Sequence, residues 1–173
     1  MEPSTQTKLY DYKDLFNLLI RLQNDSRLPN KFIISGKKGI GKSTFAYHFV
    51  NYLFSKDEEN KYDLSNLKIN KDNRSYNLVK KKTHPNFFLV DIGENKKLID
   101  ISQIRNMLQF SNRSSFNNRY KIILIDNIEY LNISSANALL KVLEEPNEKL
   151  IFILIHNSAK KILSTIKSRC IVF

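Results

Sequence analysis

The sequence predicts an α/β domain with a mostly parallel sheet that is covered by helices on both faces. Short, continuous apolar runs, typical of buried parallel strands, occur at 31–35, 87–90, 120–125 and 150–155. Segments with apolar residues at helical spacing alternate with these runs, which is the order expected of α/β proteins. A glycine-rich loop at 36–43 joins the first run to a helical segment, as in many strand-loop-helix units.

Four helices are predicted from the spacing of apolar residues, at 11–24, 44–54, 101–110 and 136–143. Asp11 is placed to cap the first of these helices. Ser134 or Ser135 can cap the fourth, which is expected to end at Glu144, Glu145 and Pro146 because proline cannot continue a helix. The beginning of a further strand is predicted at 171–173, where the sequence stops.

The segment 56–82 is polar, with eight basic and five acidic side chains and few apolar ones, so we expect a long loop or insertion. Three adjacent lysines, Lys80, Lys81 and Lys82, are interpreted as solvated surface, with phosphate contact as the alternative. His84 precedes a proline and is interpreted as a turn residue in preference to a ligand or a base.

Length and composition set outer bounds on the protein. A chain of 173 residues with 42% hydrophobic content can bury one good core, so we expect 1–173 to form a single domain. No stretch approaches the ~20 uninterrupted apolar residues of a membrane span, and the first residues lack the basic-then-apolar order of a signal peptide. The sequence therefore predicts a cytoplasmic protein without membrane contact.

The cysteine count and the net charge restrict the ligands. A single cysteine, Cys170, excludes an internal disulfide, and together with three scattered histidines it provides no ligand set for zinc. We expect no metal other than Mg²⁺. The net charge of +11 favours polyanions such as nucleic acid, but abundant Lys, Asn and Ile are also consistent with a coding bias. Direct DNA contact is left open.

The loop matches the complete phosphate-binding pattern G-x-x-x-x-G-K-S. Its residues are Gly36, Lys37, Lys38, Gly39, Ile40, Gly41, Lys42 and Ser43, followed by Thr44 at the start of the helix. Glycines let successive backbone N–H groups face a phosphate chain, Lys42 can reach the terminal phosphates, and Ser43 can bind Mg²⁺. The alternative is a turn that only joins a strand to a helix. The strand-to-helix context favours nucleotide binding at 36–44.

Asp126 follows the apolar run 122–125, so a buried strand would deliver its carboxylate to the phosphate site, where it can bind Mg²⁺. The alternative is an aspartate that caps the following turn. Asn127 occupies the position of a water-activating glutamate, and an amide can orient water but cannot accept its proton. Glu129 lies two residues further along. ATP binding is therefore better supported than hydrolysis.

These features together resemble the clamp-loader subunits of bacterial DNA polymerase III, which are AAA+ ATPases, and the delta prime type most of all. The resemblance rests on the phosphate loop, the strand that ends at Asp126, the run Ala-Asn-Ala-Leu-Leu-Lys-Val-Leu-Glu-Glu-Pro at 136–146, and Ser-Arg-Cys at 168–170. It covers about 28–170, and the run at 136–146 is its most specific part.

The resemblance implies an AAA+ P-loop NTPase domain with a five-stranded parallel sheet. It also implies that Asn157 is the polar sensor of the terminal phosphate and that Arg169 is an arginine finger, which reaches ATP on a neighbouring subunit. Many relatives carry a four-cysteine zinc module where this chain has the Cys-free segment 56–82. The lid and helical collar of the family are not in these 173 residues, so we interpret the sequence as a fragment or a shortened protein.

The function implied by the resemblance is that of a clamp-loader subunit, which helps to place a sliding clamp on primed DNA during replication. Its implied partners are the gamma/tau and delta subunits in a ring, the sliding clamp, and DNA through the complex. The alternatives are a gamma/tau-type motor subunit, an autonomous P-loop NTPase or small kinase, and a binding module without nucleotide.

Overall fold

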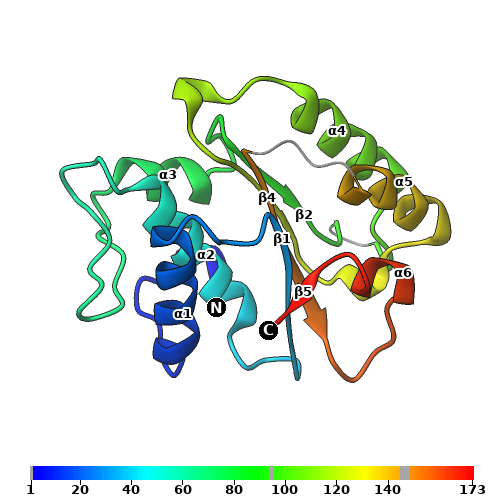
Figure 1. Cartoon of the computed structure of the whole chain (residues 1–173), viewed down its shortest axis with the longest axis horizontal. Coiled ribbons are helices and arrows are strands. Elements are labelled where there is room, and N and C mark those ends of the chain that lie inside the picture. The colour runs from blue at the N-terminus through cyan, green and yellow to red at the C-terminus, as the bar shows by residue number, and fades with distance from the viewer. Residues whose placement is uncertain (1, 94–95, 145–148) are drawn as a thin grey trace. The chain divides into compact units, whose positions relative to one another are not determined.

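The computed structural model describes residues 2–93, 96–144 and 149–173 (Figure 1). The chain divides into two compact units. The first unit combines Met1–Pro29 with Gly41–His84, and the second combines Asn30–Ile40 with Pro85–Phe173. The chain passes from the second unit to the first between Ile40 and Gly41, within the phosphate loop.

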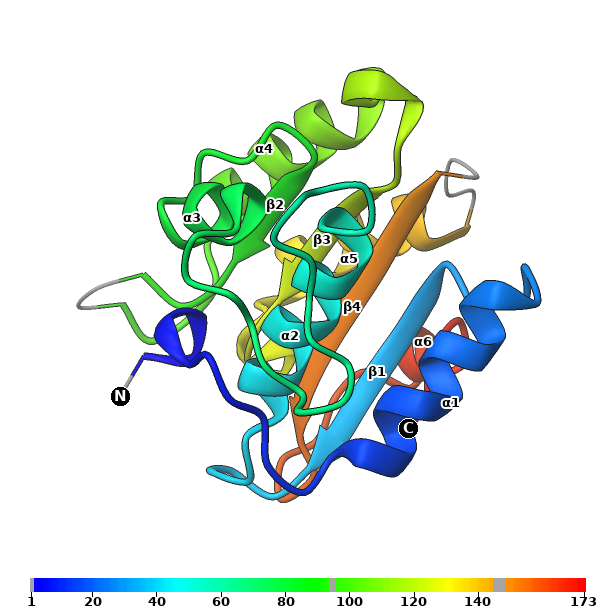
Figure 2. The ribbon, with the colours of Figure 1, turned by 90° about the vertical axis from the view of Figure 1, so that its left-hand side faces the viewer.

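The second unit contains a five-stranded sheet in which every pair of neighbouring strands is parallel. The strands are β1 (Lys31–Gly36), β2 (Phe87–Val90), β3 (Lys121–Ile125), β4 (Leu150–Asn157) and β5 (Ile171–Val172). Their order across the sheet is β2-β3-β4-β1-β5. Figure 2 shows β2, β3, β4 and β1 side by side in this sheet. The predicted five-stranded parallel sheet is confirmed. β4 runs two residues beyond the predicted range, so Asn157 ends the strand instead of following it.

Helices α4 (Ile101–Asn112), α5 (Ile133–Glu144) and α6 (Ser164–Lys167) belong to the same unit as the sheet. The apolar faces of these helices share one buried cluster with the strands. Its largest members include Ile33, Ile104, Met107, Leu139, Phe152 and Ile166. Burial of such a continuous apolar surface is the main source of stability in an α/β unit.

Two lysines at the starts of strands satisfy the ends of two helices in this unit. Lys31 Nζ donates to the carbonyl of Leu143 near the end of α5, at 2.6 Å. Lys121 Nζ donates to the carbonyls of Phe110, Ser111 and Arg113 at the end of α4. The last carbonyls of a helix have no partner within the helix, and a cation also suits the negative end of the helix dipole.

The start of α5 differs from the prediction. The helix begins at Ile133, and Asn132 provides the capping side chain, because its Oδ1 accepts a hydrogen bond from the backbone N–H of Ser135 at 2.8 Å. Ser135 is buried, and its hydroxyl donates to the carbonyl of Ile99. The prediction that Ser134 or Ser135 caps this helix is therefore wrong. The described part of α5 ends at Glu144, and the predicted stop at Glu145 and Pro146 lies outside the described residues.

The first unit consists of a short 3-10 turn (Pro3–Thr5), α1 (Lys13–Asn24), α2 (Lys42–Phe54) and α3 (Arg74–Lys80), with their connections. Its core is aromatic. Phe16 stacks on Tyr62 with ring centroids 5.2 Å apart and meets Phe45 and Phe49 edge-on. Offset and edge-on ring pairs of this kind add to the free energy gained from burial alone.

Asp11 does not cap α1. The helix begins at Lys13, and Asp11 has φ +60°, which is left-handed and places it outside the helix. A capping side chain requires an extended backbone at the residue directly before the helix, and here that residue is Tyr12.

The segment 56–82 is not a long loop throughout, because it contains α3. Asn73 caps this helix by accepting from the N–H of Tyr76 at 2.6 Å, and Tyr76 and Val79 are buried. Glu58 ties the preceding segment to the helix, since its carboxylate accepts hydrogen bonds from Asn73 Nδ2 and from Ser75. Some of the polar side chains that indicated a loop therefore make hydrogen bonds within this segment.

Lys80, Lys81 and Lys82 are all exposed at the end of α3, in agreement with the interpretation as solvated surface. The ring of His84 stacks on Phe54 with centroids 4.1 Å apart. A packing role for His84 is therefore observed where a turn residue was predicted.

Candidate nucleotide-binding site

The phosphate loop contains the two glycines with positive φ, Gly39 at +87° and Gly41 at +88°. Residues with side chains rarely adopt this conformation, so the path of the loop requires glycine at both positions. Lys37, Lys38, Gly39 and Ile40 are exposed. This part of the loop therefore lies at the surface of the chain.

The loop leads directly into α2, whose N-cap residue is Gly41. A glycine has no side chain that could accept hydrogen bonds from the first N–H groups of the helix, and no side-chain cap is present. These N–H groups and the positive end of the dipole of a 13-residue helix suit a phosphate. Lys42, Ser43 and Thr44 form this first turn, so the residues present fit the phosphates of a nucleotide and a Mg²⁺ ion.

At the carboxyl ends of the central strands, the predicted sensor Asn157 lies beside Gly36. The two residues are paired in the β1–β4 register, and the N–H of Ser158 donates to the carbonyl of Gly36 at 3.0 Å. β1 lies between β4 and β5, so the chain leaves β1 at a switch in strand order. Ligands of open α/β sheets bind outside the carboxyl ends of strands at such a point.

Asp126 follows β3 at the same edge of the sheet. Its N–H donates to the carbonyl of Val90, and its Oδ1 accepts from the N–H of Asn127 at 2.9 Å. One oxygen of the Asp126 carboxylate therefore caps the following turn, as the alternative interpretation predicts. The same contact orients the carboxylate. Asp126 lies at the edge of the sheet where the sequence predicts Mg²⁺ binding.

Asn127 has a left-handed backbone, with φ 58° and ψ 48°, which asparagine tolerates better than most residues. Its side-chain Nδ2 donates to Asp91 Oδ1 at 2.9 Å. Asp91 follows β2, and its Oδ1 also accepts from the N–H of Ile92. Asn127, at the position of a water-activating base, therefore joins the ends of β2 and β3 through its side chain.

Glu129 lies in the turn after Asn127, and its Oε2 accepts a hydrogen bond from the backbone N–H of Asn157 at 3.2 Å. The side-chain Oδ1 of Asn157 accepts from the N–H of Ala159. These two bonds fix the backbone and the side chain of Asn157. Glu129 therefore holds the backbone of the predicted sensor, Asn157. The sequence did not predict this contact.

Asp91 was not singled out from the sequence. Its signal is the same as that of Asp126, namely an acid directly after an apolar run, here 87–90. The register pairs Val90 with Ile125, so the two acids follow paired residues of neighbouring strands.

Arg169 lies away from this group, between α6 and β5. β5 starts opposite Phe32, near the beginning of β1, so Arg169 is at the amino-terminal edge of the sheet. Its Nη2 donates to Glu144 Oε1 at 2.7 Å and its Nη1 donates to the carbonyl of Thr165 at 2.9 Å. Burial raises the pKa of the neighbouring Cys170 thiol to about 11, so this cysteine is protonated at neutral pH.

No group of three or more His, Cys, Asp and Glu side chains in the described part of the chain is arranged to hold a metal ion. Among residues 2–93, 96–144 and 149–173, no helix has the length and apolar character needed to span a bilayer.

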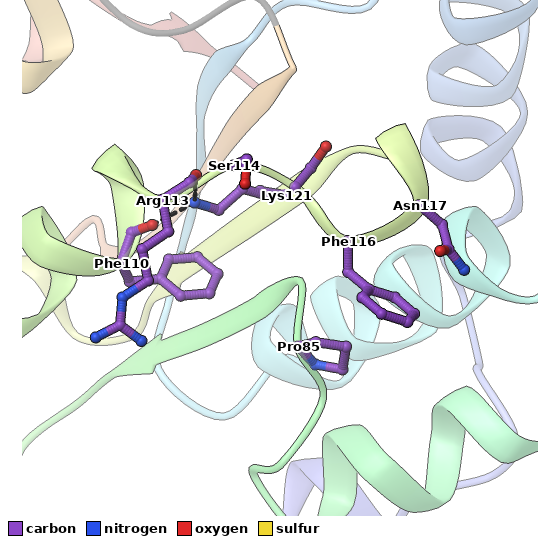
Figure 3. A pocket seen from close by; sticks show the side chains of 8 residues that line it. Pro85, Phe110, Arg113, Ser114, Phe116, Asn117 and Lys121 are labelled. Carbon is purple, nitrogen blue, oxygen red and sulfur yellow. Dashed lines mark hydrogen bonds between the residues drawn. The ribbon is translucent and has the colours of Figure 1, made fainter.

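A separate cavity of about 300 Å³ lies where β2 and β3 begin (Figure 3). It is lined by Pro85, Phe110, Arg113, Ser114, Ser115, Phe116, Asn117 and Lys121. The ammonium group of Lys121 faces the helix carbonyls of α4 (Figure 3). The ammonium group of Lys121 therefore serves to satisfy the end of a helix.

The fold and the loop are those of a P-loop NTPase domain of the AAA+ type. The structure is similar to the RuvB Holliday junction branch migration motor of Thermotoga maritima, with a TM-score of 0.55 and 15% identity over 99% of this chain and 48% of that one. It is also similar to a DNA polymerase III gamma subunit-related protein of Thermotoga maritima, with a TM-score of 0.53 and 22% identity over 90% of this chain and 44% of that one.

The family model for "DNA polymerase III, delta subunit" matches residues 12–173, and the chain belongs to this family. DNA polymerase III subunit delta' of Pseudomonas aeruginosa is 31% identical over 140 residues, which are 81% of this chain and 41% of that protein. Subunit gamma of Buchnera aphidicola is 31% identical over 147 residues, 85% of this chain and 38% of the relative. The chain thus spans about two fifths of the length of these relatives.

Proposed function

We propose that this chain is the nucleotide-binding part of a clamp-loader subunit of bacterial DNA polymerase III, of the delta prime type. In this role it binds ATP with Mg²⁺ and helps to load the sliding clamp on primed DNA. The observation that carries the proposal is the uncapped start of α2 directly after a loop with two glycines at positive φ, in a member of this family.

Within the proposed nucleotide site, Lys42 reaches the terminal phosphates and Ser43 binds Mg²⁺, together with Asp126. The backbone of 36–44 holds the phosphate chain, and Asn157 senses the terminal phosphate. The proposal includes weak or absent hydrolysis, because Asn127 cannot accept a proton and its side chain contacts Asp91.

Arg169 acts on a neighbour in the proposed ring with gamma/tau and delta subunits. Its place at the amino-terminal edge, opposite the edge that holds Asn157, supports a role toward a second molecule's nucleotide. An arginine that stabilises the charge of the transferred phosphoryl group is worth ~10³-fold or more in rate.

A gamma/tau-type motor subunit is the second candidate, because the phosphate loop is complete and the Buchnera gamma subunit is 31% identical. The two candidates differ in whose nucleotide is hydrolysed. For a delta prime subunit, Arg169 matters more to ATP turnover than Lys42 does. For a motor subunit, the order is reversed.

The test uses the full-length protein in a complex reconstituted with gamma/tau, delta, clamp and primed DNA. Lys42→Ala and Arg169→Ala are compared by clamp-stimulated ATPase, with the exposed Lys71→Ala as the control for loss of one positive charge. A larger loss from Arg169→Ala supports the proposal, and unchanged activity in that variant contradicts the trans role. Binding of a fluorescent ATP analogue, lost in Lys42→Ala, tests the nucleotide site separately. No binding at millimolar nucleotide would leave only a scaffold role.

A further inference from the structure

Glu144 and Arg169 form an ion pair that joins the end of α5 to the turn after α6. The two helices lie side by side in Figure 1. The guanidinium is held at both terminal nitrogens, by Glu144 Oε1 at Nη2 and by the carbonyl of Thr165 at Nη1. The Arg169 side chain is 32% exposed and that of Glu144 is 54% exposed, so the pair is accessible from outside the chain.

A contribution to stability does not explain this pair well. Exposed ion pairs contribute little to the free energy of unfolding. Glu144 is the last described residue of α5. A cation, Lys31, already satisfies the Leu143 carbonyl at this helix end. The contact that the structure shows for the carboxylate is the one with Arg169, so its defined effect is on the position of that guanidinium.

The contact geometry restricts the guanidinium while leaving it able to bind a further group. An arginine presents five N–H donors in one plane, and the two hydrogen bonds use one donor on each terminal nitrogen. Fixing both nitrogens fixes the plane of the fork and removes much of the rotamer freedom of the long side chain. A group held in this way before its ligand arrives loses less entropy on binding.

We propose that Glu144 is a positioning residue for Arg169. Its carboxylate holds the guanidinium so that the remaining N–H groups face the terminal phosphate of a nucleotide bound by the neighbouring subunit. This inference rests on the proposed function, in which Arg169 acts in trans. Glu144 itself does not touch the nucleotide.

The experiment measures kcat and KM for ATP in the reconstituted complex that contains the full-length protein. The variants are Glu144→Ala, Glu144→Gln, Arg169→Ala and the double variant Glu144→Ala with Arg169→Ala. Lys141→Ala is the control, because Lys141 is exposed on the same helix one turn earlier. Urea unfolding of each isolated variant reports any loss of folding.

Glu144→Ala is expected to lower kcat roughly tenfold at an unchanged KM, since a displaced guanidinium stabilises the transition state less well. Glu144→Gln keeps an oxygen acceptor and is expected to lose less. The double variant is expected to match Arg169→Ala, because a positioning residue has no effect when its target is absent.

The outcomes separate this inference from the proposed function. Unchanged kcat in Arg169→Ala would contradict the trans-acting arginine itself. A loss in Arg169→Ala with wild-type kcat in Glu144→Ala would overturn only the positioning role. A further loss from Glu144→Ala in the Arg169→Ala background would also overturn it, because the carboxylate would then act independently of the guanidinium.

Discussion

Asn127 Nδ2 donates a hydrogen bond to Asp91 Oδ1 at 2.9 Å, so the side chain after Asp126 joins the ends of β2 and β3. The contact has two consequences. The Asn127 amide is engaged in a contact between two strand ends. Position 127, where a water-activating base would lie, is also in direct contact with the Asp91 carboxylate. A base placed at 127 would therefore meet a negative charge directly.

The first prediction is that Asn127→Glu does not produce ATP hydrolysis. The new carboxylate loses the hydrogen bond to Asp91, faces a like charge, and must adopt a left-handed backbone that glutamate disfavours. We expect the free energy of unfolding to fall by about 1–3 kcal/mol. Phosphate release and urea unfolding measure the two effects.

Asn127→Gly is the matched control, because glycine adopts the left-handed conformation freely and lacks the hydrogen bond. It is expected to lose less stability than Asn127→Glu. Rapid ATP hydrolysis by Asn127→Glu would show that position 127 can reach the attacking water, contrary to its contact with Asp91.

The second prediction concerns Glu58, whose carboxylate accepts hydrogen bonds from Asn73 and Ser75 at the start of α3. Glu58→Ala leaves these donors without their acceptor and is expected to lower the free energy of unfolding by about 2 kcal/mol. Glu59→Ala, an exposed neighbour, is expected to change it little. Urea unfolding measures both variants.

If hydrogen bonds rather than a metal order the segment 56–82, EDTA leaves the urea midpoint of the nucleotide-free protein unchanged. The sequence has one cysteine, and the described residues contain no cluster of metal-ligating side chains. A midpoint lowered by EDTA and restored by Zn²⁺ would contradict the ordering of this segment by hydrogen bonds.

The strands could be predicted from sequence because a buried parallel strand is a run of apolar residues, and 122–125 contains nothing else. The loop at 36–43 was also predictable, since positive φ at Gly39 and Gly41 requires glycine. In both cases the type of residue alone determines the local structure.

The capping residues and α3 could not be predicted with the same certainty. Asp11, Asn132 and Ser135 all have side chains that can cap a helix, and their roles depend on backbone angles that the sequence does not fix. In α3, the hydrogen bonds that replace apolar burial come from Glu58, 15 residues before Asn73. The contact between Glu129 and Asn157 spans 28 residues and depends on the pairing of the strands.

The third prediction is that the protein loses stability between pH 6.5 and pH 4 because of His48. Burial lowers the pKa of His48 from 6.5 to about 4, and its Nδ1 is 2.8 Å from the Tyr62 hydroxyl. Between these two pKa values the unfolded chain binds more protons than the folded chain. The free energy of unfolding is therefore not reduced by His48 above pH 6.5, and it falls as the pH decreases from 6.5 to 4. The expected loss at pH 5 is about 2 kcal/mol relative to pH 7.

Urea midpoints at pH 7 and pH 5 test this dependence. His48→Leu is expected to be less stable at pH 7 but to have a smaller pH dependence, because the titrating group is gone. Tyr62→Phe removes the hydroxyl and keeps the imidazole, so it is expected to keep the pH dependence. An equal slope in His48→Leu and the unaltered protein would assign the acid lability to other groups.

The fourth prediction is that Lys121→Met destabilises the second unit although methionine fills similar space. The ammonium group donates to the carbonyls of Phe110, Ser111 and Arg113, and it lies 4.3 Å from the centre of the Phe110 ring. Without it these carbonyls at the end of α4 lose a shared donor, and we expect a loss of about 2–4 kcal/mol in the free energy of unfolding. Lys97→Met, at an exposed position, is the control. A loss in Lys121→Met no larger than in Lys97→Met would mean that water replaces the ammonium group through the adjoining cavity.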